Sequence, residues 1–315
     1  MRKKNDYGVY FNAGLGNQLF QFSFAHLLFR EQGDKANYLN DKYHRPDRPF
    51  ELEFLLKDCT HLSKIVSEPS KFDFWYRKVV NRLFRVNLIS LLSKVTSANF
   101  LGVEINPFAD RYIRRNIFTP RIFMGYFQHW KFVENAWDLY SFEIINYLST
   151  SIILDDLSID LDNYIVLHVR RGDLTNQLGS IGALSVPYYK NAIMKIKNYQ
   201  DKQLIILTDD LTGANDVIID LKPDIVFGPE NLSPWQALKL MSLADSLICA
   251  NSTLSWWGAY LAIKCNPKAE CVIPEPWFRN WPQPVGDAFA YPLFLKNNSV
   301  FLENKKISSD FKYTS

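Results

Sequence analysis

The sequence has few cysteines and no long apolar run, and each of these absences excludes a class of protein. The four cysteines, Cys59, Cys249, Cys265 and Cys271, show no C-x-x-C spacing and no nearby histidine pairs, so neither a zinc site nor a disulfide framework is indicated. No run of about 18 apolar residues occurs, and the amino terminus passes from a few charges directly into a strand-like segment. These features predict a cytoplasmic protein in a reducing compartment.

The chain also lacks a strong excess of charge. Lysine and arginine (36) nearly balance aspartate and glutamate (33), and the net charge of +3 argues against a dedicated nucleic-acid-binding protein, which would need a basic patch. Hydrophobic residues make up 47% and charged residues 22%, which excludes a disordered chain. A length of 315 residues is typical of two domains of about 150 residues each.

Strand-like runs alternate with helix-like segments, which predicts an α/β architecture with parallel sheets. The chain opens with a strand, a glycine turn and a helix that ends near Gly33. In the second half we predict strands or strand ends at 164–169, 203–210, 223–228, 245–253 and 269–276, with helices at 233–244 and 253–264. Residues 155–162 are the expected junction between two domains, 1–155 and 156–315.

Four polar segments fall where predicted strands end. They read NAGLGNQ (12–18), HVRRGD (168–173), TDD (208–210) and NST (251–253). In open α/β sheets, ligands bind at the carboxyl ends of strands, where loops and helix amino termini converge. This distribution predicts one binding cleft shared by the two domains.

The segment HVRRGD follows the apolar run YIVLHV, so two arginines emerge from a buried strand. Alternation along the strand sends Arg170 and Arg171 to opposite faces, so only one of them points at a ligand. A guanidinium there suits a phosphate, because it bonds two oxygens at once. The alternatives are a structural pair with Asp173, or an exposed Arg-Gly-Asp adhesion loop.

The other three segments have structural readings as well. Gly14 and Gly16 begin a G-x-G-x-x-G pattern that fails at Leu19, so a dinucleotide site is weakly indicated, and no Walker G-x-x-x-x-G-K-[ST] motif occurs. Amides at the helix start near Gly16 could face an anion. Asn251 or Ser252 could simply cap the following helix, and the aspartates of TDD could do the same.

The ordered set of motifs resembles the bacterial α-1,2-fucosyltransferases of glycosyltransferase family 11. The matching segments are GLGNQLFQF, MGYFQHW (124–130), HVRRGDL, LTDD and NSTLSWWGAYL, and the resemblance covers roughly residues 8–280. It implies a GT-B-like α/β fold, with two Rossmann-like domains facing a cleft and GDP-fucose held mainly by the carboxyl-terminal domain. No other cofactor is implied.

The resemblance also implies roles for individual residues. Arg170 would contact the β-phosphate, His168 would lie near the nucleoside, and Asp209 or Asp210 near the base. The diphosphate would be bound by Asn251, Ser252 and Thr253, and Gly14, Gly16, Asn17 and Gln18 would close over it from the amino-terminal domain. Tyr126 and Gln128 would hold the acceptor, a galactose-containing oligosaccharide or a lipid-linked glycan.

The implied reaction inverts the anomeric centre of β-linked fucose and gives an α product. Arg170 and the helix start at Ser252 would stabilise the charge that develops on the β-phosphate. The sole D-x-D, Asp160-Leu161-Asp162, lies in the presumed linker, so no metal site is expected. Asp173 is the candidate base, with two alternatives: it orients Arg171, or the departing phosphate takes the proton.

The segment FDFWYRKVVNRLFRV (72–86) mixes aromatic and basic residues, a pattern that suits either a packed helix or peripheral contact with an anionic membrane. Two rival functions stay open. One is a GT-B fucosyltransferase of another linkage or donor. The other is a non-catalytic sugar-nucleotide binding protein. Turnover distinguishes a non-catalytic binding protein from an enzyme. The linkage of the product distinguishes an α-1,2-fucosyltransferase from a fucosyltransferase of another linkage.

Overall fold

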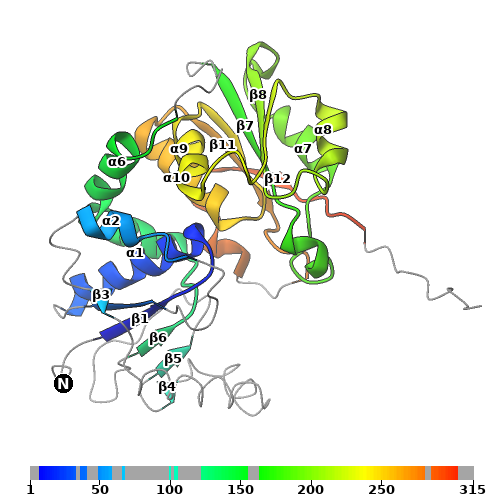
Figure 1. Ribbon diagram of the computed structural model, residues 1–315. Helices are drawn as coiled ribbons and strands as arrows, with labels where there is room; N and C mark the ends of the chain where they lie inside the picture. The colour runs from blue at the N-terminus through cyan, green and yellow to red at the C-terminus, as the bar shows by residue number, and fades with distance from the viewer. Residues whose placement is uncertain are drawn as a thin grey trace, which may run out of the picture.

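The computed structural model describes residues 7–32, 36–40, 49–58, 66–67, 99–100, 103–105, 122–154, 163–280 and 285–303. The described strands form two six-stranded sheets, one from the first half of the chain and one from the second. The two sheets lie in separate α/β domains, with helices between them (Figure 1). The expected junction, the D-x-D sequence and the basic segment 72–86 lie outside the described residues.

The amino-terminal sheet has the order β3-β2-β1-β6-β5-β4 and is parallel except for the β4–β5 pair. Its strands are β1 (Tyr7–Phe11), β2 (Ala36–Asn40), β3 (Val66–Ser67), β4 (Asn99–Phe100), β5 (Val103–Ile105) and β6 (Ile122–Met124). The described helices of this half are α1 (Leu15–Gln32), α2 (Glu53–Asp58), α5 (Trp130–Ala136) and α6 (Ser141–Thr150).

The carboxyl-terminal sheet is parallel throughout and has the order β12-β11-β10-β7-β8-β9. Its strands are β7 (Tyr164–Val169), β8 (Gln203–Thr208), β9 (Ile225–Phe227), β10 (Ser246–Ile248), β11 (Glu270–Glu275) and β12 (Leu295–Asn298). Its helices are α7 (Val186–Ile193), α8 (Asn215–Leu221), α9 (Pro234–Leu243) and α10 (Thr253–Cys265). The strands and helices predicted for this half are therefore confirmed.

Both sheets have a topological switch point, where the order of strands reverses. In the carboxyl-terminal sheet the first strand, β7, lies beside the fourth, β10, which is the doubly wound order of Rossmann-like domains. In the amino-terminal sheet β1 lies between β2 and β6, so its switch point falls between β1 and β6. The expected GT-B-like arrangement of two Rossmann-like domains is confirmed by this topology.

The sequence of α10 explains its central position. The run Ser255–Ile263 is buried on every side, as expected for an inner helix that is apolar around its whole circumference. By contrast, α9 begins at a capping box in which Ser233 and Gln236 satisfy each other's backbone N–H groups, with Pro234 at the first helical position. α9 and α10 cover the face of the carboxyl-terminal sheet that is turned toward α1 (Figure 1).

The two domains share one continuous apolar core. Phe20 of α1 packs on two tryptophans of α10, with ring centroids 4.7 Å from Trp256 and 5.5 Å from Trp257. The indole N–H of Trp235 donates to the carbonyl of Glu51, 2.8 Å away.

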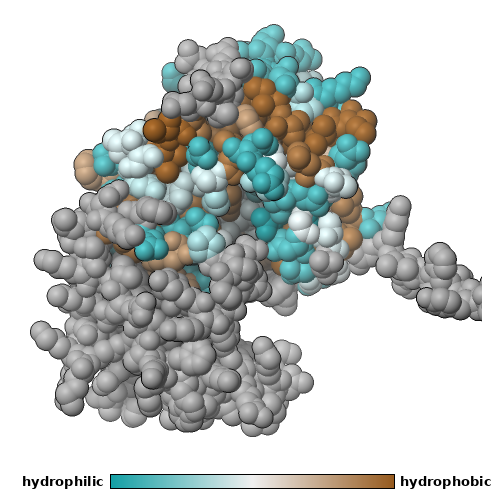
Figure 2. Space-filling model, viewed as in Figure 1, coloured by the Kyte–Doolittle hydropathy of each residue, from teal (hydrophilic) through white to brown (hydrophobic). Residues whose placement is uncertain are grey.

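On the face of the molecule shown in Figure 2, hydrophobic and hydrophilic residues are interspersed over the described part. None of the described helices is long and apolar enough to cross a bilayer.

Candidate functional site

The motifs predicted at strand ends flank the two switch points. The HVRRGD turn follows β7 and the NST segment follows β10, which are neighbouring strands. The glycine turn follows β1 and the GYFQ segment follows β6, which are also neighbours. These four segments therefore lie where ligands bind in doubly wound sheets, whereas the predicted TDD segment follows β8, one strand away.

The guanidinium of Arg170 is held by two carboxylates. Its Nη2 donates to Asp173 Oδ1 at 2.8 Å, and its Nε lies 3.1 Å from Asp209 Oδ2. The Arg170 side chain is 26% exposed, so the group remains open to solvent. Since Asp173 is half exposed, an anionic ligand can replace it at the guanidinium.

Arg171 points away from this site, as strand alternation predicts. Its side chain is 1% exposed, and it donates to the carbonyls of Gly213 and Leu184 and pairs with Asp216 at 3.4 Å. The two arginines thus differ in their surroundings, since Arg170 is partly exposed at the switch point and Arg171 lies in the interior. The alternative that Asp173 orients Arg171 is wrong, because Asp173 pairs with Arg170.

Asp209 organises the turn between the arginines. Its Oδ1 accepts the backbone N–H of Arg171 at 2.8 Å, while its Oδ2 faces Arg170 Nε. A side chain at Gly172 would collide with this carboxylate and would push it away from its present position beside Arg170. The contact of Asp209 with a base stays a prediction, but its hydrogen bonds make it a positioning residue for Arg170.

Asp210 closes a turn ahead of α8. Its Oδ1 accepts the N–H of Gly213 at 2.9 Å, and its own N–H and C=O are bonded to the Thr208 hydroxyl. Neither aspartate caps α8 directly, because the N-cap position is Ala214. The capping role considered for these residues is therefore replaced by turn formation.

His168 lies on the same face of β7 as Arg170 and is buried. Burial lowers its pKa to about 4, while the charge of Asp209 opposes this shift and that of Arg170 adds to it. The imidazole is therefore neutral at pH 7. Its Nδ1 has no hydrogen-bond partner among the described residues, which leaves a buried polar atom next to the Arg170 turn.

The amino end of α10 is not capped by a side chain. Ser252 occupies the N-cap position in an extended conformation without a capping hydrogen bond, and Asn251 instead donates to the carbonyl of Gly182 at 2.7 Å. The predicted capping by Asn251 or Ser252 is wrong. The first turn of α10 carries no acidic residue, so its free backbone amides around Thr253 can bind an anion.

The amino end of α1 meets the amino end of α10 across the domain boundary. A Cβ built on Gly16 would lie 2.5 Å from the backbone nitrogen of Leu254 and from the carbonyl carbon of Thr253. The first turn of α1 also carries no acidic residue. Two positive helix ends therefore converge without an opposing side-chain charge in their first turns, which favours an anion between the domains.

Gly16→Ala is expected to lower protein stability. Alanine normally improves a helix over glycine by about 1 kcal/mol, but here its Cβ would strike the backbone of α10, and such overpacking costs about 1–3 kcal/mol. Thermal unfolding followed by circular dichroism tests this, since an alanine that fitted would raise the melting temperature instead. A melting temperature equal to or above that of the parent protein would contradict the close approach of the two helices.

The remaining residues of the glycine turn differ in role. Gly14 accepts the amides of Asn17 and Gln18 and so starts the helix. Gln18 is buried, and its amide donates to the carbonyls of Ala13 and Pro49. Both N–H groups of Gln18 are thereby used within the amino-terminal domain, so its predicted contact with the phosphates is not supported.

The GYFQ segment lies directly beside the glycine turn. Gln128 donates to the side chain of Asn17, and Gln128 is largely buried whereas Tyr126 is 37% exposed. Tyr126 is therefore accessible from solvent, while Gln128 orients Asn17, and the contact of both residues with an acceptor stays a prediction. The backbone of Phe127 has a positive φ of 50°, and its ring stacks on Phe24 at 3.9 Å, which fixes the segment.

Gln21 is a site-building residue that the motif analysis missed. It accepts the N–H of Asn12 and donates to the Asn12 side chain and to the carbonyl of Gly125, so it joins the loops after β1 and β6. A fully buried glutamine in the apolar helix LFQFSFAHLL was the available signal, because a buried amide needs partners.

A polar cluster fixes α5 of the amino-terminal domain on α10. Glu134 accepts hydrogen bonds from Tyr260 at 2.7 Å and from Lys264 at 2.9 Å. Burial tends to raise the pKa of Glu134, but Lys264 and Tyr260 outweigh it and the pKa is lowered. The carboxylate is therefore ionised at neutral pH and pairs with Lys264 across the domain boundary.

No group of three or more histidine, cysteine, aspartate or glutamate side chains within the described ranges is arranged to hold a metal ion. The three described cysteines, Cys249, Cys265 and Cys271, are free thiols. Burial raises the pKa of each of them. None of these thiols is therefore activated as a nucleophile.

Comparison with known proteins gives consistent relatives. The model of the family described as Glycosyl transferase family 11 matches residues 8–268. The O-antigen biosynthesis glycosyltransferase WbnK of Escherichia coli is 26% identical over 299 residues, covering 85% of this chain and 93% of that protein. An alpha-1,2-colitosyltransferase of Escherichia coli is 25% identical over 280 residues, covering 84% and 90%.

Solved structures with a similar chain path include two glycosyltransferases. The fucosyltransferase NodZ from Bradyrhizobium aligns with a TM-score of 0.46 at 14% identity, over 82% of this chain and 94% of that chain. The Escherichia coli heptosyltransferase WaaC with ADP aligns with a TM-score of 0.44 at 10% identity, over 93% of each chain.

Proposed function

The chain belongs to glycosyl transferase family 11, and from this premise we propose that it transfers L-fucose from GDP-fucose to the 2-hydroxyl of a galactose-terminated glycan. The reaction inverts the anomeric centre and uses no metal ion. By analogy with the O-antigen relative, the product belongs to a bacterial surface polysaccharide made in the cytoplasm, on an oligosaccharide or a lipid-linked glycan.

One observation carries this proposal, namely the convergence of positive groups at the switch points. Arg170 follows β7, the uncapped start of α10 follows β10, and the start of α1 meets α10 at Gly16. These groups come from both domains and suit a diphosphate, which carries two or more negative charges. A diphosphate bound there would bridge the domains and balance the two helix ends.

The chemistry follows from where charge develops. As the bond from fucose to the diphosphate breaks, negative charge builds on the β-phosphate, and Arg170 and the α10 amides would stabilise this charge. Asp209 lies beside Arg170 Nε, so Nη1 is left for a phosphate oxygen, and Nη2 joins it once the phosphate displaces Asp173. Little reorganisation is then needed in the transition state.

Asp173 is the proposed general base. In the structure it is paired with Arg170, and a diphosphate that takes over the guanidinium would release it toward the acceptor hydroxyl. The competing route lets the departing phosphate accept the proton. Asp173→Asn distinguishes the two, since only the first route requires the carboxylate.

A different sugar nucleotide is the main alternative to GDP-fucose as the donor. The relative that is an alpha-1,2-colitosyltransferase suggests GDP-colitose, whose sugar is L-fucose without its 3-hydroxyl. A site that hydrogen-bonds this hydroxyl would reject colitose strongly, because its polar group would be left unpaired. The two donors therefore give different and measurable turnover.

The proposal is tested by GDP release from GDP-fucose and GDP-colitose, with EDTA present, over a panel of galactose-terminated acceptors. We expect acceptor-dependent release with GDP-fucose and an α-1,2 linkage in the product. Turnover with GDP-colitose but not with GDP-fucose would identify GDP-colitose as the donor. A different linkage in the product would show that another hydroxyl of the acceptor is the nucleophile. Tight GDP binding without turnover over the whole panel would favour a non-catalytic binding protein.

A further inference from the structure

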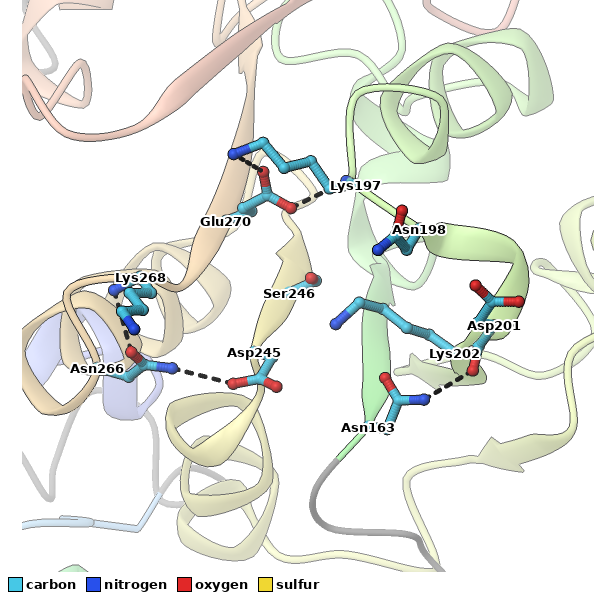
Figure 3. A pocket seen from close by; sticks show the side chains of 10 residues that line it. All are labelled: Asn163, Lys197, Asn198, Asp201, Lys202, Asp245, Ser246, Asn266, Lys268 and Glu270. Atoms are coloured by element: carbon cyan, nitrogen blue, oxygen red, sulfur yellow. Dashed lines mark hydrogen bonds and ion pairs between the residues drawn. The ribbon is translucent and has the colours of Figure 1, made fainter.

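A second polar pocket lies at the opposite end of the carboxyl-terminal sheet. Its volume is about 460 Å³, within the range of pockets that bind small molecules. The lining residues precede or open β7, β8, β10 and β11 (Figure 3). Since all these strands are parallel, their amino ends lie away from the carboxyl ends that carry Arg170, and the pocket is separate from the proposed donor site.

Ser246, the first residue of β10, points into this pocket (Figure 3). Its side chain is 1% exposed, and its hydroxyl has no hydrogen-bond partner among the described residues. Buried hydroxyl groups in folded proteins are nearly always bonded. A ligand in the pocket would supply the missing partner.

Lys202 places an ammonium group beside Ser246, in a pocket that the carboxylates of Asp201 and Asp245 also line. The neighbouring Lys197 and Glu270 neutralise each other, with Nζ 3.6 Å from Oε1 and the Lys197 N–H donating to Oε2 at 2.9 Å. The ammonium of Lys202 has no ion pair within the described part of the chain, and it extends toward Ser246 (Figure 3). A charged donor and a neutral donor thus share one space, which favours an oxyanion.

Asp245 restricts which oxyanion fits. Its Oδ1 accepts the side-chain N–H of Asn266 at 2.9 Å, which leaves its second oxygen as an acceptor in the wall next to Ser246. A carboxylate repels a fully deprotonated anion but accepts a hydrogen bond from an O–H group. Phosphate keeps a proton near pH 6, where the second ionisation of a phosphate ester is about half complete, whereas sulfate has none.

We propose that this pocket binds a phosphate group, either free or carried by a small molecule. Lys202 and Ser246 donate to phosphate oxygens, and Asp245 accepts the phosphate O–H. Phosphate binding in this pocket is independent of the transfer reaction.

Isothermal titration calorimetry at pH 6 tests this with inorganic phosphate, glycerol 3-phosphate and sulfate. The full chain is used with Arg170→Ala, which removes the guanidinium of the proposed donor site from the measurement. We expect phosphate binding that weakens by about tenfold or more in Lys202→Gln, because a charge-assisted hydrogen bond is lost, and that also weakens in Ser246→Ala. Lys131→Gln, an exposed lysine on α5, is the matched control.

Sulfate is expected to bind more weakly than phosphate, and Asp245→Asn is expected to reduce this difference. Tighter binding of glycerol 3-phosphate than of inorganic phosphate would identify an ester as the ligand, and the reverse order would identify free phosphate. Absence of binding at millimolar phosphate, or equal binding in the parent and in Lys202→Gln, would overturn the proposal. Equal affinity for sulfate would overturn the phosphate assignment. None of these outcomes depends on whether transfer occurs.

Discussion

Replacing Arg170 by alanine is expected to reduce transfer by about 100-fold or more while the protein stays folded. The guanidinium is partly exposed at the end of β7, and loss of a single preorganised contact to a developing anion typically costs about 3 kcal/mol in the transition state. Initial rates at saturating acceptor, with GDP release as the readout, give the effect directly.

The fold should survive this change because Arg170 is partly exposed and its partners keep other contacts. Asp209 retains the backbone N–H of Arg171, and Asp173 is half exposed to water. Arg170→Lys is the matched control, since it keeps the charge but loses the paired hydrogen bonds, and it should recover part of the rate. An alanine variant that kept most of its activity would show that the diphosphate does not lie at this arginine.

Replacing the adjacent Arg171 by alanine is expected to have the opposite phenotype, a loss of stability by about 2–4 kcal/mol, because two carbonyls lose their donor. The side chain is 1% exposed, and its removal leaves the carbonyls of Leu184 and Gly213 without their donors and Asp216 without its counter-charge. Urea unfolding followed by tryptophan fluorescence measures the free energy, and Arg170→Ala run in the same way is the control.

The two variants together test the division of labour in the turn. If Arg171→Ala unfolded at the same urea concentration as Arg170→Ala, the internal role of Arg171 would be disproved. If Arg171→Ala proved stable but inactive, Arg171 would be the residue that faces the ligand and Arg170 the internal one. Both conclusions require the two variants to be compared, because Arg170 and Arg171 are neighbours in one turn.

Several site assignments depended on partners that are distant in the sequence. The sequence left open whether Asp209 caps a helix or binds a base, and the structure gives it the task of holding the arginine turn 38 residues earlier. Asn251 was a plausible cap, yet it bonds a loop 69 residues away at Gly182. A short polar side chain in a loop has many possible partners, so its sequence neighbours do not select one.

The sequence by itself determined the second half of the fold and the location of its motifs. Apolar runs such as YIVLHV and the helix-like segments 233–244 and 253–264 are local patterns, so the predicted limits of β7, α9 and α10 lie close to the observed ones. Strand alternation likewise placed the two arginines on opposite faces, because it is a property of the local backbone.

Only the tertiary structure decided that Arg171 is the buried arginine of the pair, and that the amino ends of α1 and α10 meet. Gly16 and Thr253 are more than 200 residues apart, and their approach follows from the packing of Phe20 on the α10 tryptophans. Local periodicity carries no information about such a distance. The contact depends on how two separately formed domains bury their shared apolar surface, and it is this burial that builds the candidate site.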